Sequence, residues 1–228
     1  MLKPGDCVWL SGHSPTSGAD GQLERQLEVL DAIPVPPPAI ALHFRVPSYK
    51  KRNWFDMESL GYVILASWRH HRPPPAPPMT ELYRPRSIWL TMEKTSEEEK
   101  GMVLCHEPPA EPSAGTVRVD VVIANPPKSS IRGTNLPELA GHEELSDEPW
   151  LGLDLTFGQE VDIGEFGFDG PVKGLIDAMY PVLGGRSGHP ADHRLHDLRI
   201  RRDVRDDGSV RARFWYSPEL KSQPNRTG

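Results

Sequence analysis

The sequence predicts an α+β protein made of two tandem β-α-β-α-β-β repeats. Short segments in which apolar residues alternate with other residues predict strands, and segments with apolar residues every three or four positions predict helices. The same order of segments occurs twice, and Val8 and Val119 mark an offset of 111 residues between the copies. A proline-rich stretch lies between the two copies, so a domain boundary is expected there.

The first half contains four expected strands and two expected helices. Leu42 and Phe44 alternate with Ala41 and His43, as residues do in a strand with one buried face. The expected strands cover residues 8–10, 40–46, 88–92 and 102–104, and the last two are expected to form a hairpin. The expected helices cover about residues 21–33 and 60–68.

The second half has the same order of elements. Val172, Leu175, Ile176 and Met179 share one face of an expected helix that Pro181 ends. The expected strands cover residues 117–121, 151–157, 198–200 and 210–214. The turn Asp206-Asp207-Gly208 predicts that the last two strands form a hairpin.

The internal repeat rests on pattern, because few residues are identical in the two halves. At the constant offset, Leu42 falls on Leu153 and Phe44 on Leu155. The alternative is that two α+β stretches resemble each other by chance. The predicted organisation is a first repeat over 1–105, a proline-rich linker over 106–116, a second repeat over 117–217 and a polar tail over 218–228.

Length and composition fit a folded protein with many turns. The chain has 228 residues, of which 25 are proline, roughly twice the usual share. No segment approaches the ~18 consecutive apolar residues of a membrane span, and residues 1–6 lack the apolar core of a signal peptide. Two cysteines, Cys7 and Cys105, cannot make a disulfide framework, so we expect a reducing, cytoplasmic environment. The net charge of −6 argues against non-specific coating of nucleic acid but is compatible with a local basic patch.

The densest chemical signal lies between residues 165 and 202. Asp169 is expected at the start of a helix, where a carboxylate is stabilised by exposed backbone N–H groups. Lys173 and Asp177 follow at four-residue spacing and therefore share one helix face with it, and Asp192 is able to fold back towards them. Carboxylates grouped with a lysine suit a hard divalent cation that engages a phosphodiester. The alternative is an ordinary surface ion pair between Asp169 and Lys173.

This segment resembles the RusA-like family of Holliday junction resolvases, which are small metal-dependent DNA endonucleases. Asp169 matches the second aspartate of the family's motif Asp-x-Asp-Asn, and Lys173 and Asp177 match the lysine and aspartate that follow it. Residues 121–128 resemble the family's first strand and proline-rich turn.

The later family motif, Asp-Asp-x-x-Val followed by a basic strand, also has a counterpart. Asp192 matches its second aspartate, Leu195 its valine, and Arg199 and Arg201 its basic strand. The resemblance covers about residues 117–216 and extends to the first half only through the repeat.

The resemblance implies an endonuclease of DNA recombination and repair that cleaves branched DNA such as Holliday junctions. Asp169 and Asp192, with Glu165 as a substitute carboxylate, are the implied ligands of Mg²⁺ or Mn²⁺, and Lys173 is the implied partner of the leaving group. Family members act as homodimers on a two-fold symmetric junction. A fused duplicate therefore implies a single-chain pseudo-dimer, with further oligomerisation left open.

Three positions depart from the family pattern. Gly167 stands at the first catalytic aspartate, Gly170 at the asparagine, and Ala191 at the first member of the later aspartate pair. These departures favour an alternative function, in which a catalytically lapsed RusA-like fold serves as a DNA-binding or protein-interaction module.

The first half keeps other parts of the pattern. Asp56 and Glu58 occupy both acidic positions of the opening motif, and Glu81 falls on Asp192 at the constant offset, whereas Tyr62 replaces the lysine. These carboxylates are candidates for a second site. The alternative interpretation is a helix cap and first-turn charge.

Basic and aromatic side chains of the last two strands are candidates for DNA contact. Phosphate contact is one interpretation of the arginines, and a solvated face balanced by nearby aspartates such as Asp197 is the other. The candidate DNA-binding residues are Arg199, Arg201, Arg211 and Arg213, and Trp215 beside them is placed to stack on a base.

Three histidines, His189, His193 and His196, precede the basic strand. A zinc site needs a closed set of ligands, and no cysteine lies near them in the sequence. We therefore expect them to lie on a solvated loop.

Overall fold

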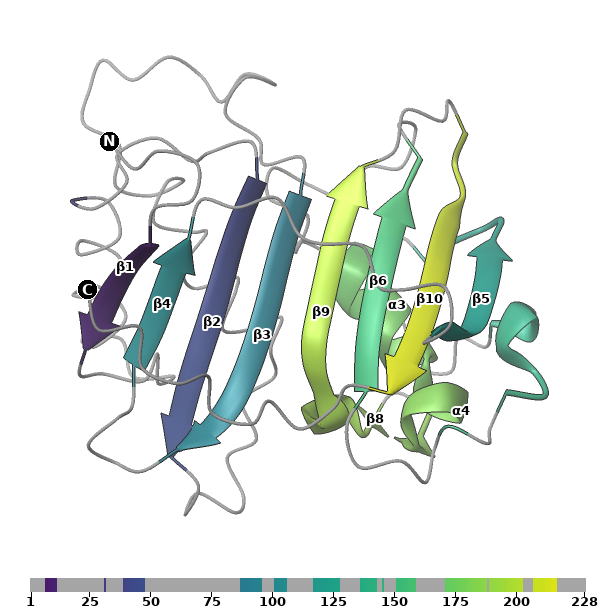
Figure 1. Cartoon of the computed structure of the whole chain (residues 1–228). Helices are drawn as coiled ribbons and strands as arrows, with labels where there is room; N and C mark the ends of the chain where they lie inside the picture. The colour runs from purple at the N-terminus through teal and green to yellow at the C-terminus, as the bar shows by residue number, and fades with distance from the viewer. Residues whose placement is uncertain are drawn as a thin grey trace.

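One eight-stranded mixed sheet organises the computed structural model (Figure 1). The structure describes residues 7–11, 31, 39–47, 87–95, 101–105, 117–127, 136–142, 145, 151–158, 171–187, 189–202 and 207–216. The strands of this sheet are β1 Cys7–Ser11, β2 Ala39–Pro47, β3 Ser87–Thr95, β4 Gly101–Cys105, β5 Val117–Ile123, β6 Leu151–Phe157, β9 Leu195–Arg202 and β10 Val210–Tyr216. The other elements are α3 Pro171–Ala178, α4 Tyr180–Leu183, the short strands β7 Gly185–Arg186 and β8 His189–Pro190, and the 3-10 turns η3 Pro137–Leu139 and η5 Asp192–Arg194.

The mixed α+β class and the eight expected strands are confirmed. The expected helix over 172–179 is α3, which ends at Ala178. Pro181 does not end it but lies in the first turn of α4, where proline leaves no hydrogen bond unmade. Of the expected helix over 21–33 the structure describes Asp31 alone, in helical conformation. The helix expected over 60–68, the linker over 106–116 and the tail over 218–228 lie outside the described residues.

The same strand order occurs twice in the sheet. The overall order is β1-β4-β2-β3-β9-β6-β10-β5, so the first four strands run 1-4-2-3 and the last four, read from the other edge, run β5-β10-β6-β9 in the same pattern. The directions also agree. In each group the two outer pairings are antiparallel, and the pairing nearest the middle of the sheet, β2 with β3 or β6 with β9, is parallel.

The two hairpins expected from sequence are absent from this sheet, and that prediction was wrong. β4 lies between β1 and β2 rather than beside β3, and β10 lies between β5 and β6 rather than beside β9. For β9 and β10 the reason is visible in β6, which is buried along nearly its whole length and needs hydrogen-bonding neighbours on both sides. β9 supplies one neighbour and β10 the other, so the connection from β9 to β10 passes β6.

The two groups of strands meet where β3 pairs with β9 in antiparallel fashion, and we call this pairing the seam. Leu90 pairs with Leu198 at the seam. Each of them also occupies the same place in its own group, because Leu90 pairs with Leu42 and Leu198 pairs with Leu153. The offset between the groups is therefore not constant: it is 153 − 42 = 111 for the second strands but 198 − 90 = 108 for the third. The connection between the second and third strands is three residues shorter in the second group. Glu81 was aligned with Asp192 at an offset of 111, and this offset does not hold in β9, the strand that follows Asp192.

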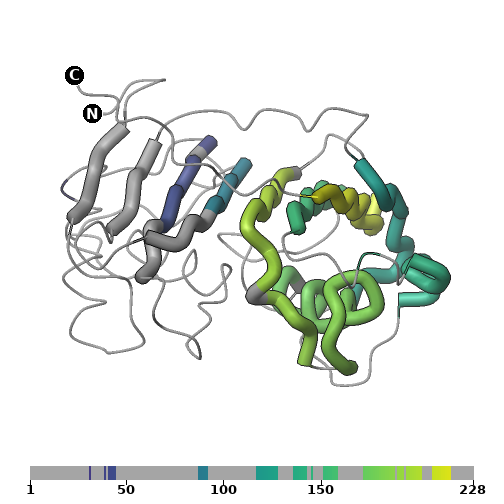
Figure 2. Tube along the Cα trace, turned by 60° about the horizontal axis from the view of Figure 1, so that its bottom comes forward, coloured from purple at the N-terminus to yellow at the C-terminus, as the bar shows by residue number. Residues whose placement is uncertain are grey.

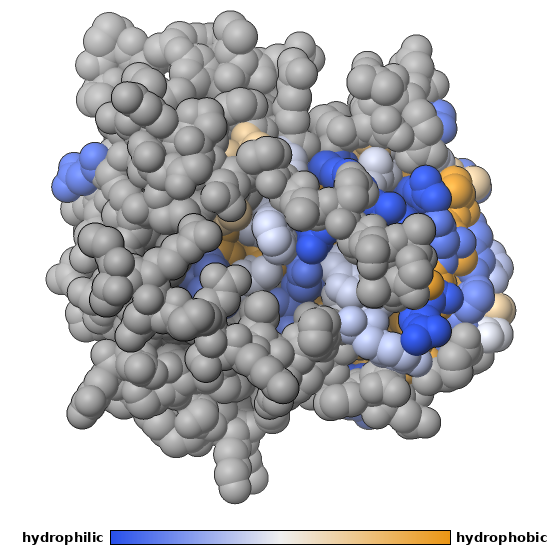
Figure 3. Space-filling view, viewed as in Figure 1, coloured by the Kyte–Doolittle hydropathy of each residue, from blue (hydrophilic) through white to orange (hydrophobic). Residues whose placement is uncertain are grey.

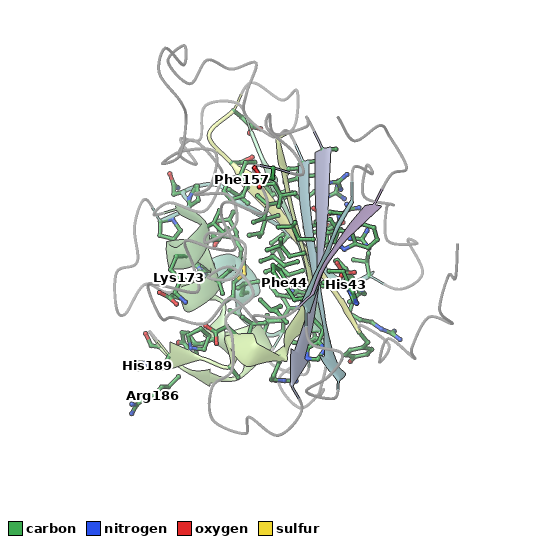
Figure 4. All side chains as sticks on the ribbon, turned by 90° about the vertical axis from the view of Figure 1, so that its left-hand side faces the viewer. His43, Phe44, Phe157, Lys173, Arg186 and His189 are labelled. Carbon is green, nitrogen blue, oxygen red and sulfur yellow. The ribbon has the colours of Figure 1, made fainter. Side chains whose placement is uncertain are left out.

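The core lies on one face of the sheet. Buried residues that pair in succession cross six strands, and each is at most 1% exposed: Leu42, Leu90, Leu198, Leu153, Phe214 and Val119. Val172, Ile176 and Met179 of the α3 segment belong to the same buried cluster. Figures 1 and 2 show α3 and α4 on one side of β9, β6 and β10, and Figure 4 shows Phe44 on the helix side and His43 on the other.

None of the helices in the described part of the chain is long and apolar enough to cross a membrane.

Shortening a seam leucine tests the placement of the core. We expect Leu198→Ala to lower the free energy of unfolding by about 2–5 kcal/mol, because it leaves a cavity at a fully buried position. The matched control is Val122→Ala, at a side chain that is 49% exposed, and its effect should stay within about 0.5 kcal/mol. Urea denaturation of both variants measures the difference. Equal losses at the two positions would contradict a buried seam.

Candidate functional site

The start of α3 carries a lysine between two carboxylates. Lys173 and Asp177 lie one turn apart, and Lys173 Nζ lies 3.3 Å from Asp177 Oδ1. Asp192 comes from η5, and its Oδ2 accepts a hydrogen bond of 3.4 Å from the same Nζ. We call Lys173, Asp177 and Asp192 the α3 cluster. These contacts confirm that Asp192 folds back towards the helix, as its place in the sequence allows.

A buried arginine holds the segment that brings Asp192 to the helix. Arg194 donates to the backbone carbonyl of Leu183 at 2.6 Å and to that of Leu145 at 3.0 Å. The backbone N–H of Ala191 donates to Gly184 at 2.9 Å. The turn η5 is thus tied on both sides of Asp192 to the end of α4, which fixes its distance from Lys173.

The cluster is partly open to solvent, and its two carboxylates supply hard oxygen donors. The Lys173 side chain is 35% exposed and that of Asp192 19% exposed. Carboxylate oxygens in such a position suit Mg²⁺ or Mn²⁺, as proposed for this segment. The described residues contain no group of three histidine, cysteine, aspartate or glutamate side chains close enough to hold a metal ion. The other proposed carboxylates and the glycines at motif positions lie outside the described residues: Glu165, Asp169, Gly167, Gly170, Asp56, Glu58 and Glu81.

The candidate DNA-binding arginines lie on the other face of the sheet from the α3 cluster. In β9 and β10 they alternate with the buried residues Leu198, Ile200, Ala212 and Phe214, whose side chains pack in the core with α3. We call this face, which carries Arg199, Arg201, Arg211 and Arg213, the arginine face. The apolar nature of the opposite side is confirmed, although the strands do not form the expected hairpin. Figure 3 shows hydrophilic side chains gathered on this face.

Each of these arginines is bound to a carboxylate. Asp154 is fully buried and accepts from Arg201 and Arg213, with Nη2 to Oδ2 distances of 2.7 and 2.6 Å. Asp120 accepts from Arg211 through both oxygens, at 2.8 and 2.6 Å. The Arg211 side chain is 47% exposed and is the most open of the four.

An aromatic cluster on the same face joins the two groups of strands. The Arg199 guanidinium lies over the ring of Trp89 at 4.6 Å and over that of Trp215 at 5.1 Å. Asp197 accepts from Arg199 at 3.2 and 3.1 Å, and from the Trp89 indole N–H at 2.6 Å. Trp215 is 5% exposed, and its ring lies against the Arg199 guanidinium. In this structure the arginine thus occupies the ring face on which the sequence suggested that a DNA base stacks.

Close packing of Trp215 depends on a glycine in the neighbouring strand. Gly152 pairs with Trp215, and a Cβ atom at that position would overlap the indole ring. Any larger residue at Gly152 would therefore displace Trp215 from its place beside Arg199.

Sequence reasoning missed Asp154, Trp89 and Asp120. The signal for Asp154 was present, because it is a charged residue inside the apolar strand Leu-Gly-Leu-Asp-Leu-Thr-Phe, and a buried carboxylate needs cationic partners. Trp89 lies 108 residues from Asp197 in the sequence, so nothing local predicted their contact.

The histidines separate in the structure. His189 is exposed in β8, whereas His196 lies in β9 and is 8% exposed. The prediction of a solvated loop was therefore wrong for His196, because the strand begins earlier than the apolar alternation indicated. His193 lies in η5.

Two carboxylates on this face have opposite pKa shifts. Burial raises the pKa of Asp197 above its ordinary value of 3.8, although Arg199 and Trp89 act in the opposite direction. The hydrogen bond from Arg211 holds the pKa of Asp120 below 3.8, and the same contact raises the pKa of Arg211.

Searches against protein-family models, curated proteins and solved structures found no match to this chain.

We expect the stability lost on replacing Asp197 and the stability lost on replacing Asp120 to change with pH in opposite directions. The raised pKa of Asp197 means that its protonated form contributes stability at low pH that is lost as pH rises through the folded-state pKa. The lowered pKa of Asp120 means that its charged form contributes stability above about pH 3.8, which is lost as pH falls. The free energy of unfolding of wild type minus that of Asp197→Asn should therefore fall from about pH 3 to about pH 7, and the same difference for Asp120→Asn should rise.

Denaturant unfolding at several pH values measures both differences. Because each substitution removes one carboxyl group from the same face, each variant is the control for the other. Slopes of the same sign would contradict the assignment.

Proposed function

We propose that this chain is a metal-dependent endonuclease that acts on branched DNA such as Holliday junctions, with its candidate site in the second half. The observation that carries the proposal is the contact of Lys173 with both Asp177 and Asp192. Lys173 and Asp177 match the first motif of the RusA-like pattern, and Asp192 matches the later motif. Asp177 and Asp192 are 15 residues apart in the sequence. A family site needs the two motifs to meet, and the contacts of Lys173 with Asp177 and Asp192 support this.

The arrangement of strands supports the proposal of a tandem duplication. The two groups of four strands share one order and one set of directions. They meet through equivalent residues, because Leu90 and Leu198 hold the same place in their groups and pair with each other. An antiparallel pairing of equivalent residues is what a two-fold axis produces in a homodimer. We therefore propose a RusA-like single-chain pseudo-dimer.

The proposed site uses the α3 cluster together with residues outside the described part. Asp169 and Asp192, with Glu165 as substitute carboxylate, would hold Mg²⁺ or Mn²⁺. The bound ion would activate water and stabilise charge on the scissile phosphate. Lys173 is already positioned by two carboxylates, and its ammonium group would neutralise charge on the leaving oxygen.

The arginine face constrains how DNA would bind. Three of its arginines, Arg199, Arg201 and Arg213, are largely buried against Asp197 and Asp154. A phosphate would have to displace these carboxylates. Arg211 is more exposed, and its pairing with half-exposed Asp120 is weak in water. Arg211 is therefore the best placed of the four for phosphate contact.

A second candidate function is a catalytically lapsed RusA-like fold that serves as a DNA-binding or protein-interaction module. Two observations favour it. Gly167, Gly170 and Ala191 stand at positions where the family pattern has polar side chains. The arginine face is neutralised by carboxylates of its own, which favours the protein-interaction form of this alternative over DNA binding.

Cleavage of a synthetic four-way junction with Mg²⁺ or Mn²⁺ separates the two functions. We expect cleavage by the wild type and a loss of at least about 100-fold in Asp169→Asn and Asp192→Asn, because each removes a proposed metal ligand. The control is Asp120→Asn, which makes the same change of charge on the opposite face and should cleave at least as well as the wild type. No cleavage by the wild type, or equal cleavage by Asp169→Asn, would reject the enzymatic function. Junction binding without cleavage would then favour the DNA-binding module.

The role of Arg211 is tested through the salt dependence of junction binding. If Arg211 contacts one phosphate, Arg211→Ala should reduce the slope of log binding constant against log salt by about 0.9. Asp120→Asn releases Arg211 from its partner, so this variant should bind at least as tightly as the wild type. Fluorescence anisotropy at several salt concentrations measures both. An unchanged slope in Arg211→Ala would remove this residue from the interface.

A further inference from the structure

The two cysteines of the chain occupy opposite positions in the backbone register of one strand pairing. Cys7 is the first residue of β1 and Cys105 the last residue of β4, and they are direct partners in the antiparallel ladder. The ladder is regular on either side of Trp9, which pairs with Val103, and it continues to Ser11, which pairs with Gly101. The fold therefore brings together two cysteines that are 105 − 7 = 98 residues apart in the sequence.

Direct partners in an antiparallel ladder are within the range of a disulfide bond. Their Cα atoms lie about 4.5–5.5 Å apart. Disulfides join residues whose Cα atoms are about 4.4–6.8 Å apart. The register of β1 and β4 thus meets the distance requirement without movement of the backbone.

We propose that Cys7 and Cys105 are a redox modification site and form a reversible intramolecular disulfide with oxidised glutathione. The thiolate of one cysteine attacks a sulfur of glutathione disulfide, which forms a mixed disulfide and releases one glutathione. The thiolate of the other cysteine then attacks the protein sulfur of the mixed disulfide and expels the second glutathione. Two electrons and two protons pass from the protein thiols to glutathione, one protein S–S bond forms, and the glutathione S–S bond breaks.

The position of the pair gives the bond a structural consequence. β1 is an edge strand with β4 as its neighbour in the sheet. Cys105 ends the last strand of the first group, directly before the linker predicted over 106–116. A bond between Cys7 and Cys105 would therefore close the first group of strands into one loop and attach its edge strand covalently.

The proposal agrees with a reducing compartment. Two thiols in a glutathione-rich environment remain reduced, and a disulfide there forms when the glutathione pool becomes oxidised. The proposal does not depend on nuclease activity, so failure of either one leaves the other standing.

Equilibration of the purified full chain with glutathione redox buffers tests the bond directly. After quenching with an alkylating agent, intact-mass analysis should show a monomer that has lost about 2 Da and carries no alkyl group under oxidising conditions. Excess reduced glutathione should return the doubly alkylated form. A product with glutathione on both cysteines, free thiols throughout, or a disulfide-linked dimer on a non-reducing gel would each overturn the proposal.

A variant with its cysteine out of register is the matched control. In Cys105→Ser with Val103→Cys, the second cysteine stands opposite Trp9 and diagonal to Cys7. Diagonal partners lie about 7–8 Å apart, beyond the usual disulfide range. Its equilibrium constant for ring closure against glutathione should be at least about tenfold lower than that of the wild type. Equal constants would mean that closure does not depend on the register and would overturn the proposal.

Thermal unfolding tests the structural consequence. Closing a loop of this length should raise the Tm of the oxidised wild type by about 5–15 °C relative to the reduced protein. The double variant Cys7→Ser with Cys105→Ser should have the same Tm in both buffers. If this variant does not fold, Cys7→Ala with Cys105→Ala replaces it as the control. An oxidised wild type that is no more stable than the reduced protein would reject the loop-closing role.

Discussion

The pairing of β3 with β9 is the interaction on which the rest of the structure depends, because it joins two four-stranded groups into one sheet. On the helix side the seam is apolar, with Leu90 and Leu198 fully buried. On the other side Trp89 packs against the Arg199 guanidinium and donates its indole N–H to Asp197. The two sides of the seam contribute differently. Burial of leucine supplies free energy roughly in proportion to apolar area, whereas the buried ion pair demands one particular geometry, since a charge left without its partner is costly.

The sheet also separates the two kinds of chemistry that the sequence placed in one segment. The α3 cluster lies on the helix side, while alternate residues of β9 and β10 carry the arginines to the opposite face. The arginine face is internally neutralised, and the fully buried carboxylate of Asp154 between Arg201 and Arg213 is its centre. Such a carboxylate with two guanidinium partners stabilises its surroundings only while both contacts hold. The face therefore has a structural role of its own, whatever else contacts it.

Much of this fold was predictable from the sequence, and the exceptions share one cause. Alternation of apolar residues identified six strands of the sheet, short apolar runs identified β1 and β4, and helical spacing identified α3. The neighbours of each strand were not predictable in the same way. Leu198 and Phe214 show the same alternation whether β9 and β10 pair with each other or enclose β6, and the turn between them suggested the wrong choice. Asp154 was overlooked for a related reason, because its partners Arg201 and Arg213 come from two different strands.

The sequence by itself determined where the eight strands of the sheet lie, which face of β9 and β10 is apolar, and that Asp177 shares a helix face with Lys173. These properties depend on periods of two and 3.6 residues, which are local and repeat along the chain. Only the tertiary structure decided the order of strands, the meeting of Lys173 with Asp192, the contact of Trp89 with Asp197, and the register of Cys7 with Cys105. Those contacts join residues that are not neighbours in the chain, so local periodicity does not specify them. The strand order around β6 is selected because this buried strand must satisfy its backbone hydrogen bonds on both sides, and the seam forms because its leucines leave water together.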